Sequence, residues 1–158
     1  MPKLSLVFLR QDTQKVGAEE IHFERIKALL AIGNSGQVLQ DCIVDTGCTL
    51  SLFPQRQWER FDKDISWLYT PGSRSDLPDW LCKATGLGAT AVDCQIGKVT
   101  IQIIELPTGL RTPSVEIIAK FPLDNGGYSQ ILLGLGGKAF SNWDFTLRYG
   151  KQSVWLEF

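Results

Sequence analysis

Six short apolar runs, most of them rich in Val, Ile or Leu, follow one another along the chain. Glycine, proline, asparagine or aspartate separates most of these runs, and such residues favour turns. Runs of about four to eight residues with this composition are typical of β-strands, because a helix needs a longer pattern with a helical period. We therefore predict strands at LSLVFL (4–9), IKALLAI (26–32), VLQDCIV (38–44), KVTIQII (98–104), SVEIIAKF (114–121) and QILLG (130–134).

The connections between these runs indicate hairpins and little helix. GNSG (33–36) lies between two predicted strands and has the composition of a hairpin turn. The end of the chain, 144–158, alternates on both sides of a Gly-Lys pair and predicts a closing hairpin. Helical pattern is limited to PQRQWERF (54–61), with Pro54 as the expected first helical residue, and to a short turn near 137–143. The expected fold class is therefore all-β, with one or two short helices.

Length and charge limit the classes of partner. The 158 residues are enough for one domain, 1–158. Sixteen basic and seventeen acidic side chains give a net charge of −1, and no basic run is present, which argues against a nucleic-acid partner. The first apolar stretch is too short and too charged for a signal peptide, and no run is long enough to cross a bilayer. We expect a soluble, cytoplasmic protein with no membrane partner.

The cysteines and the single histidine, His22, do not form a metal-binding pattern. Zinc sites usually use closely spaced ligand pairs such as CxxC, and this chain has none. We therefore expect no metal and no cofactor, with His22 as a strand side chain that has no catalytic task. A domain of this size does not require disulfides, so buried free thiols are the expected state. The four cysteines are Cys42, Cys48, Cys82 and Cys94.

The segment CIVDTGCTLSLF (42–53) places an acid between two apolar runs. Interpreted as a strand, a tight loop and a second strand, it puts Asp45 on the loop, and we expect this carboxylate to be buried. A buried carboxylate is costly unless it is paired, hydrogen-bonded or used in chemistry. An Asp that only caps a turn is the alternative, since Asp and Gly are ordinary turn residues. The tripeptide DTG is a weak motif alone. The rest of the sequence must therefore distinguish a carboxylate used in chemistry from an Asp that only caps a turn.

Three segments occur in an informative order. They are a hairpin that enters the tripeptide, ALLAIGNSGQVLQDCIVDTG (28–47), a glycine-rich tip, GLGA (86–89), and an apolar-apolar-glycine signature, LLG (132–134). This order resembles the retropepsin-like aspartic proteases, a single-lobe family that includes retroviral proteases and bacterial relatives. The resemblance covers roughly residues 26–158. It does not explain 1–25, which we interpret as an N-terminal strand and lead-in.

The resemblance implies a fold and a reaction. The fold would be a single-lobe closed barrel or sandwich, and the activity that of an aspartic endopeptidase on a peptide or protein substrate. Peptide hydrolysis of this type needs two carboxylates that share one proton, so that one activates a water and the other donates to the developing oxyanion. The chain holds one DTG and is too short for two lobes. The resemblance therefore implies a homodimer in which Asp45 meets its twin across a two-fold axis.

The resemblance also assigns roles to the neighbours of Asp45. The Thr46 side chain would hydrogen-bond across the dimer axis. Gly47, which has no Cβ, would let the backbone approach substrate and partner loop closely. Gly134 would let the apolar strand pack tightly behind the catalytic loop. The tip residues that would close over the peptide as a substrate-binding flap are Gly86, Leu87, Gly88 and Ala89.

Cys48 follows the tripeptide at a position where the family usually carries Ala or Ser. A hydrogen bond to a carboxylate favours its charged form, and a thiol is a weaker donor than a hydroxyl. We therefore expect the carboxylate pair to be less acidic than in pepsin-like enzymes, with an optimum at mildly acidic to near-neutral pH. The simpler interpretation is that Cys48 is a small buried side chain that fills space.

Two other functions are compatible with parts of the sequence. A catalytically silent dimeric module of the same fold could bind peptides or support an assembly, although an inactive descendant has no chemical reason to keep Asp45. ILLGLGGKAF (131–140) also imitates the G-x-G-x-x-A fingerprint of dinucleotide-binding proteins. Only twenty-four residues follow Gly134, which is too few for the βαβ unit that this fingerprint requires.

Overall fold

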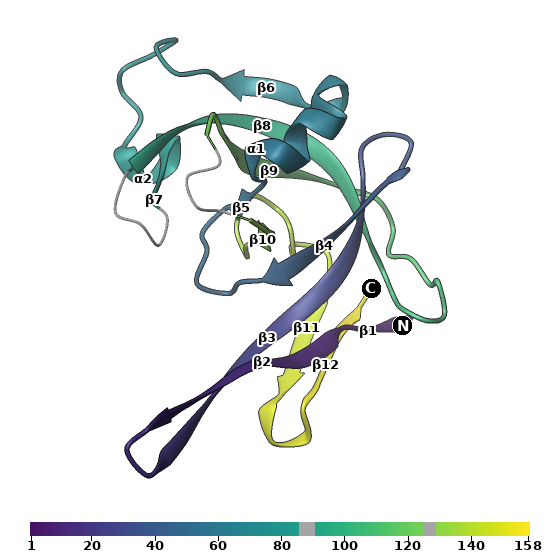
Figure 1. Cartoon of the computed structure of the whole chain (residues 1–158). Coiled ribbons are helices and arrows are strands. Elements are labelled where there is room, and N and C mark those ends of the chain that lie inside the picture. The colour runs from purple at the N-terminus through teal and green to yellow at the C-terminus, as the bar shows by residue number, and fades with distance from the viewer. Residues whose placement is uncertain (86–90, 125–128) are drawn as a thin grey trace.

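The computed structural model describes residues 1–85, 91–124 and 129–158, and it is predominantly β (Figure 1). Within these residues, twelve strands and four short helical segments follow one another, which confirms the predicted all-β class. The strands are β1 (Lys3–Ser5), β2 (Val7–Val16), β3 (Glu19–Ile32), β4 (Val38–Val44), β5 (Ser51–Leu52), β6 (Ser66–Tyr69), β7 (Lys83–Thr85), β8 (Ala91–Ile104), β9 (Val115–Pro122), β10 (Ile131–Leu133), β11 (Asp144–Arg148) and β12 (Ser153–Glu157). The helical segments are α1 (Gln55–Trp58), η1 (Glu59–Asp64), α2 (Asp79–Cys82) and η2 (Tyr149–Lys151).

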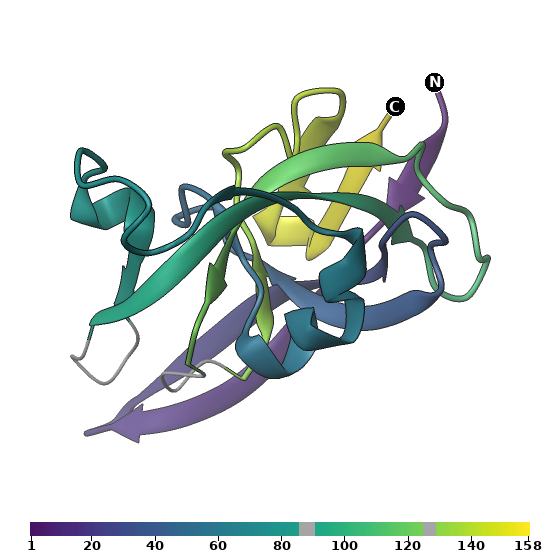
Figure 2. The same ribbon diagram turned by 90° about the horizontal axis from the view of Figure 1, so that it is seen from above.

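The larger sheet closes on itself. Its strands follow the order β3–β4–β10–β5–β9–β8, and β8 pairs again with β3, from Leu29 opposite Ile104 to Ile32 opposite Ile101. These six strands therefore form a closed barrel, with β2 added beside β3 and β6 beside β8. A smaller sheet, β1–β12–β11, joins the two ends of the chain, which lie next to each other in Figures 1 and 2.

The barrel interior is filled by alternate side chains of its strands, as expected for a sheet with one buried face. Phe53 and Phe121 are fully buried and stack with their ring centroids 5.4 Å apart. Trp58 on α1 packs edge-on against Phe121 and donates its indole N–H to the carbonyl of Pro122 at 2.8 Å. The short helices α1 and η1 therefore cover one side of the barrel through a buried aromatic cluster (Figure 2).

The ends of several elements differ from the sequence-based expectation. The predicted strand 4–9 is split at Leu6, because β1 joins the smaller sheet while β2 joins the larger one. Leu6 itself bonds to the smaller sheet, because its N–H donates to the Val154 carbonyl at 2.9 Å. Pro54 precedes α1 as its N-cap and is not its first residue. The short turn expected near 137–143 is present. The hairpins at 33–36 and 144–158 are confirmed.

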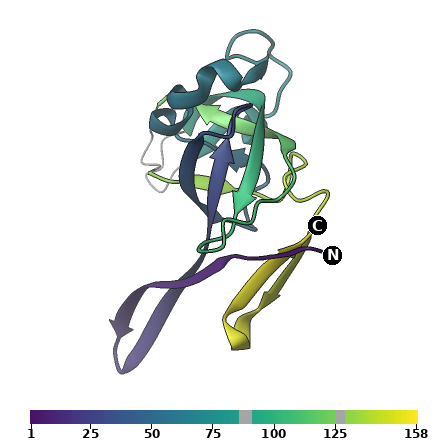
Figure 3. The same ribbon diagram turned by 90° about the vertical axis from the view of Figure 1, so that its right-hand side faces the viewer.

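Residues 7–32 contain a long hairpin that the sequence did not predict. Strands β2 and β3 pair antiparallel from Val7 opposite Lys27 to Val16 opposite Glu19, and Gly17 takes the positive φ of +64° that the turn requires. This hairpin projects from the barrel, and the C-terminal hairpin β11–β12 projects from the same side (Figures 1 and 3). The outer half of the hairpin is mostly polar, so it lacks the apolar run by which the other strands were found.

Two buried thiols predict a loss of stability at alkaline pH. Burial raises the pKa of Cys42 and of Cys94 to about 12, from an ordinary value near 9. The unfolded chain releases these protons first, so their contribution to the free energy of unfolding is complete below about pH 9 and declines between about pH 9 and 12. The decline should be about 1.4 kcal/mol per pH unit for each thiol. Urea denaturation at several pH values in the lower part of this range measures the slope.

A Cys42→Ala variant provides the control for this slope. Its stability will differ from that of the wild type at every pH, but the variant lacks one of the two titrating thiols. Its free energy of unfolding should therefore fall less steeply above about pH 9, by about 1.4 kcal/mol per pH unit. Identical slopes in the two proteins would show that the Cys42 thiol does not control alkaline stability.

Candidate active site

The position of Asp45 is set by a strand inserted between its two neighbours. Strand β10 lies between β4 and β5, parallel to β4 with Leu133 opposite Val44, and antiparallel to β5 with Leu132 opposite Leu52. The chain must therefore cross from one side of β10 to the other between β4 and β5. The crossing segment, 45–50, begins with Asp45 and is the loop that the sequence predicted to be catalytic, so we refer to it as the catalytic loop.

Backbone hydrogen bonds hold the loop in one conformation. The Asp45 N–H donates to the Leu133 carbonyl at 3.0 Å, which continues the pairing of β4 with β10. The Gly47 N–H donates to Asp45 Oδ1 at 3.0 Å, and the Cys48 N–H donates to the Asp45 carbonyl at 3.1 Å. Asp45 therefore both closes the turn and presents its carboxylate, since an Asp side chain readily accepts from a backbone two residues on.

Gly134 permits the close contact between β10 and the catalytic loop. A Cβ at this position would lie 2.5 Å from the Cys48 carbonyl oxygen and 2.9 Å from the Leu50 carbonyl carbon. The Gly134 N–H donates to the hydroxyl of fully buried Ser51 at 3.1 Å, and the Leu135 N–H donates to the Cys48 carbonyl at 3.2 Å. The tight packing that the resemblance implied for Gly134 is confirmed.

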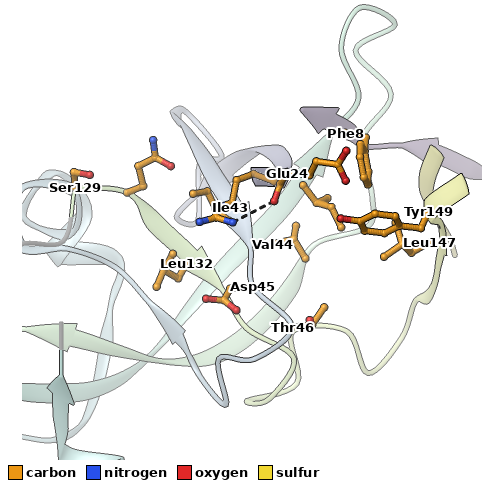
Figure 4. A pocket seen from close by; sticks show the side chains of 13 residues that line it. Phe8, Glu24, Ile43, Val44, Asp45, Thr46, Ser129, Leu132, Leu147 and Tyr149 are labelled. Atoms are coloured by element: carbon orange, nitrogen blue, oxygen red, sulfur yellow. Dashed lines mark hydrogen bonds between the residues drawn. The ribbon is translucent and has the colours of Figure 1, made fainter. Parts of the chain in front are cut away.

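A cavity of about 700 Å³ opens in front of the catalytic loop (Figure 4). Asp45 and Thr46 line it together with Leu132 of β10. Phe8 and Tyr149 lie together on one side of Asp45, with ring centroids 5.4 Å apart, so they connect the N-terminal hairpin with the C-terminal one. The cavity thus lies between the barrel, the base of the N-terminal hairpin and the turn end of the C-terminal hairpin.

Asp45 is half-buried in the single chain, so the predicted burial of its carboxylate is only partial there. Asp45 directly follows the last residue of β4 and faces the open cavity, so its side chain remains in contact with solvent. Thr46 and Gly47 are exposed beside it, and the Thr46 hydroxyl has no hydrogen-bond partner among the described residues. The three predicted catalytic residues therefore lie together on one accessible surface.

The predicted flap is described only at its base. Strands β7 and β8 pair antiparallel, with Lys83 opposite Asp93 and Thr85 opposite Ala91. The predicted substrate-binding residues Gly86, Leu87, Gly88 and Ala89 lie outside the described residues.

Cys48 directs its thiol to the carbonyl of Leu50. Its Sγ lies 2.7 Å from the Leu50 carbonyl oxygen, to which the S–H donates. Burial raises the pKa of this thiol above its ordinary value, the nearby Asp45 carboxylate raises it further, and Lys120 opposes the shift. Within one chain Cys48 is therefore a half-buried, neutral thiol, and its predicted influence on the pH optimum stays a prediction.

Lys120 is a residue near the loop that the sequence did not indicate as part of a site. It lies on β9 among apolar side chains and is one of three buried polar residues in the described part of the chain. A signal was present, because the run SVEIIAKF contains one lysine in an otherwise largely apolar strand. We interpreted this run only as a strand and assigned no role to its lysine.

Other predictions for ligands and location can be compared with the described residues. The dinucleotide interpretation of 131–140 is wrong, because β10 is followed by turns and an antiparallel hairpin where a helix and a parallel strand would be needed. His22 is an exposed residue of β3, and all four cysteines are free. In the described ranges, no group of three or more His, Cys, Asp or Glu could hold a metal ion, and no helix is long and apolar enough to span a membrane.

The cavity beside the loop contains two acids, Asp45 and Glu24, at separate places. Glu24 is another acid at the cavity of Asp45, but it lies on the side of Phe8 and Tyr149, and a hydrogen bond with Glu24 raises the pKa of Tyr149 (Figure 4). Asp45 therefore has no second carboxylate beside it among the described residues. Comparisons with protein-family models, with curated proteins and with solved structures found no match for this chain.

Proposed function

We propose that the chain is a retropepsin-like aspartic endopeptidase that hydrolyses peptide bonds as a homodimer. The observation that supports this most strongly is the placement of Asp45. It lies on a loop that wraps around an inserted strand and faces an open cavity, with a glycine packed directly behind the loop. A capping Asp in an ordinary turn would need neither the inserted strand nor the cavity.

The second copy of the chain supplies the second carboxylate. Two Asp45 side chains that approach to about 3 Å cannot both ionise, so they share a proton and titrate as one unit. Because Asp45, Thr46 and Gly47 lie on the accessible surface of one chain, a two-fold related chain can reach all three at once. The Thr46 hydroxyl then finds its partner across the axis.

The projecting hairpins suit an interface with that second copy. Val7 on β2 is 45% exposed and Leu147 on β11 is 39% exposed, although both side chains are apolar. Both lie on the hairpins that flank the cavity of Asp45. Apolar surface at such a place favours association, since its burial contributes about 25 cal/mol per Å².

The proposed reaction needs only the carboxylate pair, a water and the substrate. The ionised carboxylate takes a proton from the water as its oxygen attacks the scissile carbonyl, and the protonated carboxylate donates to the carbonyl oxygen. The protonated carboxyl then donates to the amine nitrogen as the C–N bond breaks, while the other carboxylate takes a proton from a hydroxyl of the tetrahedral intermediate, so the pair again holds one proton. The flap would exclude bulk water and hold the peptide backbone. We expect the reaction to occur in the cytoplasm, where free thiols stay reduced.

Incubation of the purified chain with a mixed peptide library, followed by mass spectrometry, tests the proposal. We expect internal cleavage at mildly acidic to near-neutral pH, inhibition by hydroxyl-bearing compounds of the pepstatin type, and no inhibition by metal chelators. If no peptide is cut at any pH while a labelled peptide still binds, the protein is a silent module of this fold. Cleavage that a chelator abolishes would point to a different chemistry.

A further inference from the structure

Lys120 lies in the barrel wall near the catalytic loop, although lysine is among the residues least often buried. It lies on β9 opposite Leu52 of β5 and Ile96 of β8, and it is 8% exposed. Transfer of an ammonium group out of water is costly unless hydrogen bonds or an opposite charge compensate it. The groups that contact its Nζ therefore show how far the cost of burying this ammonium group is compensated.

The hydrogen bonds of Lys120 are incomplete. Its Nζ donates to the carbonyl of Trp80 and to that of Lys83, the latter at 3.0 Å. An ammonium group has three N–H donors and no acceptor. Among the described residues no carboxylate lies within ion-pair distance of Nζ, and no third acceptor contacts it. Within the described part of the chain, Lys120 therefore has two backbone partners, one N–H donor without an acceptor and no carboxylate in contact.

Lys120 lines a second cavity, of about 370 Å³, at the base of the predicted flap. Leu52, Ala84 and Leu132 give this cavity apolar walls, and Asp79, an exposed residue, also lines it. Because Leu132 also lines the cavity of Asp45, the two cavities adjoin. A peptide held between the flap base and the catalytic loop would therefore place one side chain here.

Cys48 independently indicates that the two charged residues are close. It lines the second cavity and lies three residues after Asp45 on the catalytic loop. Its thiol pKa responds to both groups, since the Asp45 carboxylate raises it and the Lys120 ammonium lowers it. The cation of the second cavity therefore lies within electrostatic reach of the reacting groups.

We propose that the Lys120 cavity is a subsite for a glutamate or aspartate side chain of the peptide substrate. This inference rests on the proposed function, because it names the substrate class of the same site. The substrate carboxylate would accept the remaining N–H and supply the missing charge, while its methylene groups contact Leu52 and Leu132. A charge-assisted hydrogen bond in a desolvated site is stronger than a neutral one, so an amide of the same shape should bind less well.

Paired peptides provide the first test. Starting from any peptide that the protein cleaves, each position near the cut is set to Glu or to Gln, and kcat/KM is measured. We expect one position at which Glu exceeds Gln by about tenfold or more. The Lys120→Met variant should lose this preference and still cleave the Gln peptide. The matched control is Lys98→Met, because Lys98 lies on neighbouring β8, its side chain is 38% exposed, and it pairs with Glu116 at 3.6 Å.

A binding measurement keeps the inference testable without catalysis. N-acetyl-glutamate N-methylamide and its glutamine analogue are titrated into the Asp45→Asn protein while the Lys120 ammonium signal is followed by NMR. The glutamate probe should shift this signal and bind at least several-fold more tightly than the glutamine probe. If Lys120→Met fails to fold, the comparison of the two probes on the Asp45→Asn protein still shows whether the Lys120 cavity prefers a carboxylate to an amide.

The outcomes separate the subsite from the proposed function. Cleavage that requires Asp45 but shows no Glu preference at any position would overturn the subsite and leave the peptidase intact. A glutamate preference unchanged in Lys120→Met would also overturn it. If no peptide is cleaved but the glutamate probe binds selectively at Lys120, the binding site stands and the peptidase proposal fails.

Discussion

Replacement of Asp45 by asparagine should abolish the proposed peptide hydrolysis, with a fall in kcat of about 1,000-fold or more. Asparagine has nearly the same shape as aspartate but can neither take a proton from water nor share one with a second carboxylate. The side-chain oxygen of the new asparagine can still accept from the Gly47 N–H, which now bonds Asp45 Oδ1 at 3.0 Å, so the loop should keep its conformation. Initial rates on a cleaved library peptide, with urea denaturation of both proteins, measure the two effects.

Asp41→Asn is the matched control for this substitution. Asp41 is an exposed residue of β4, four positions before Asp45 on the same strand and loop. The two substitutions change the net charge equally, so a general electrostatic effect would appear in both. We expect Asp41→Asn to keep its activity within about twofold. Substantial hydrolysis by folded Asp45→Asn protein would refute the assignment of Asp45.

Substitution of Gly134 by alanine destabilises the protein by about 2–3 kcal/mol and removes most of the activity. The new Cβ would meet backbone atoms, 2.5 Å from the Cys48 carbonyl oxygen and 2.9 Å from the Leu50 carbonyl carbon. Backbone cannot rotate away as a flexible side chain can, so the catalytic loop must move relative to β10. Urea denaturation gives the free energy of unfolding, and the library peptide gives the activity.

Gly150→Ala provides the comparison. Gly150 lies in the β11–β12 connection, and a Cβ there would have no atom within 4 Å. This substitution should change stability by at most about 0.5 kcal/mol. Equal midpoints for Gly134→Ala and Gly150→Ala would mean that the contact between β10 and the catalytic loop is not tight in solution.

The strands that the sequence predicted well are those bounded by turn residues. VLQDCIV gave β4 with both ends correct, because the GNSG turn precedes it and the Asp45–Gly47 turn follows it. The N-terminal hairpin was missed because its outer half is mostly polar and therefore shows no apolar run. The split at Leu6 depends on which sheet each half joins, and a local apolar pattern does not contain that information.

The site was predicted in part, and for a definite reason. Asp45 lies on a loop and Gly134 packs behind it, because both features follow from short segments whose chemistry is local. The exposure of Asp45 could not be predicted, since burial depends on whether a second chain covers the cavity. Lys120 was missed because its role depends on Trp80 and Lys83, about forty residues away in the chain, whose carbonyls meet its ammonium only in the folded barrel.

If one chain contains half of a catalytic site, activity must depend on the dimer. Sedimentation velocity over a concentration series, with peptidase activity measured on the same samples, compares the two. We predict that activity per chain falls on dilution in proportion to the fraction of dimer, and that samples containing monomer alone are inactive. Constant activity per chain in samples that contain only monomer would refute the shared site.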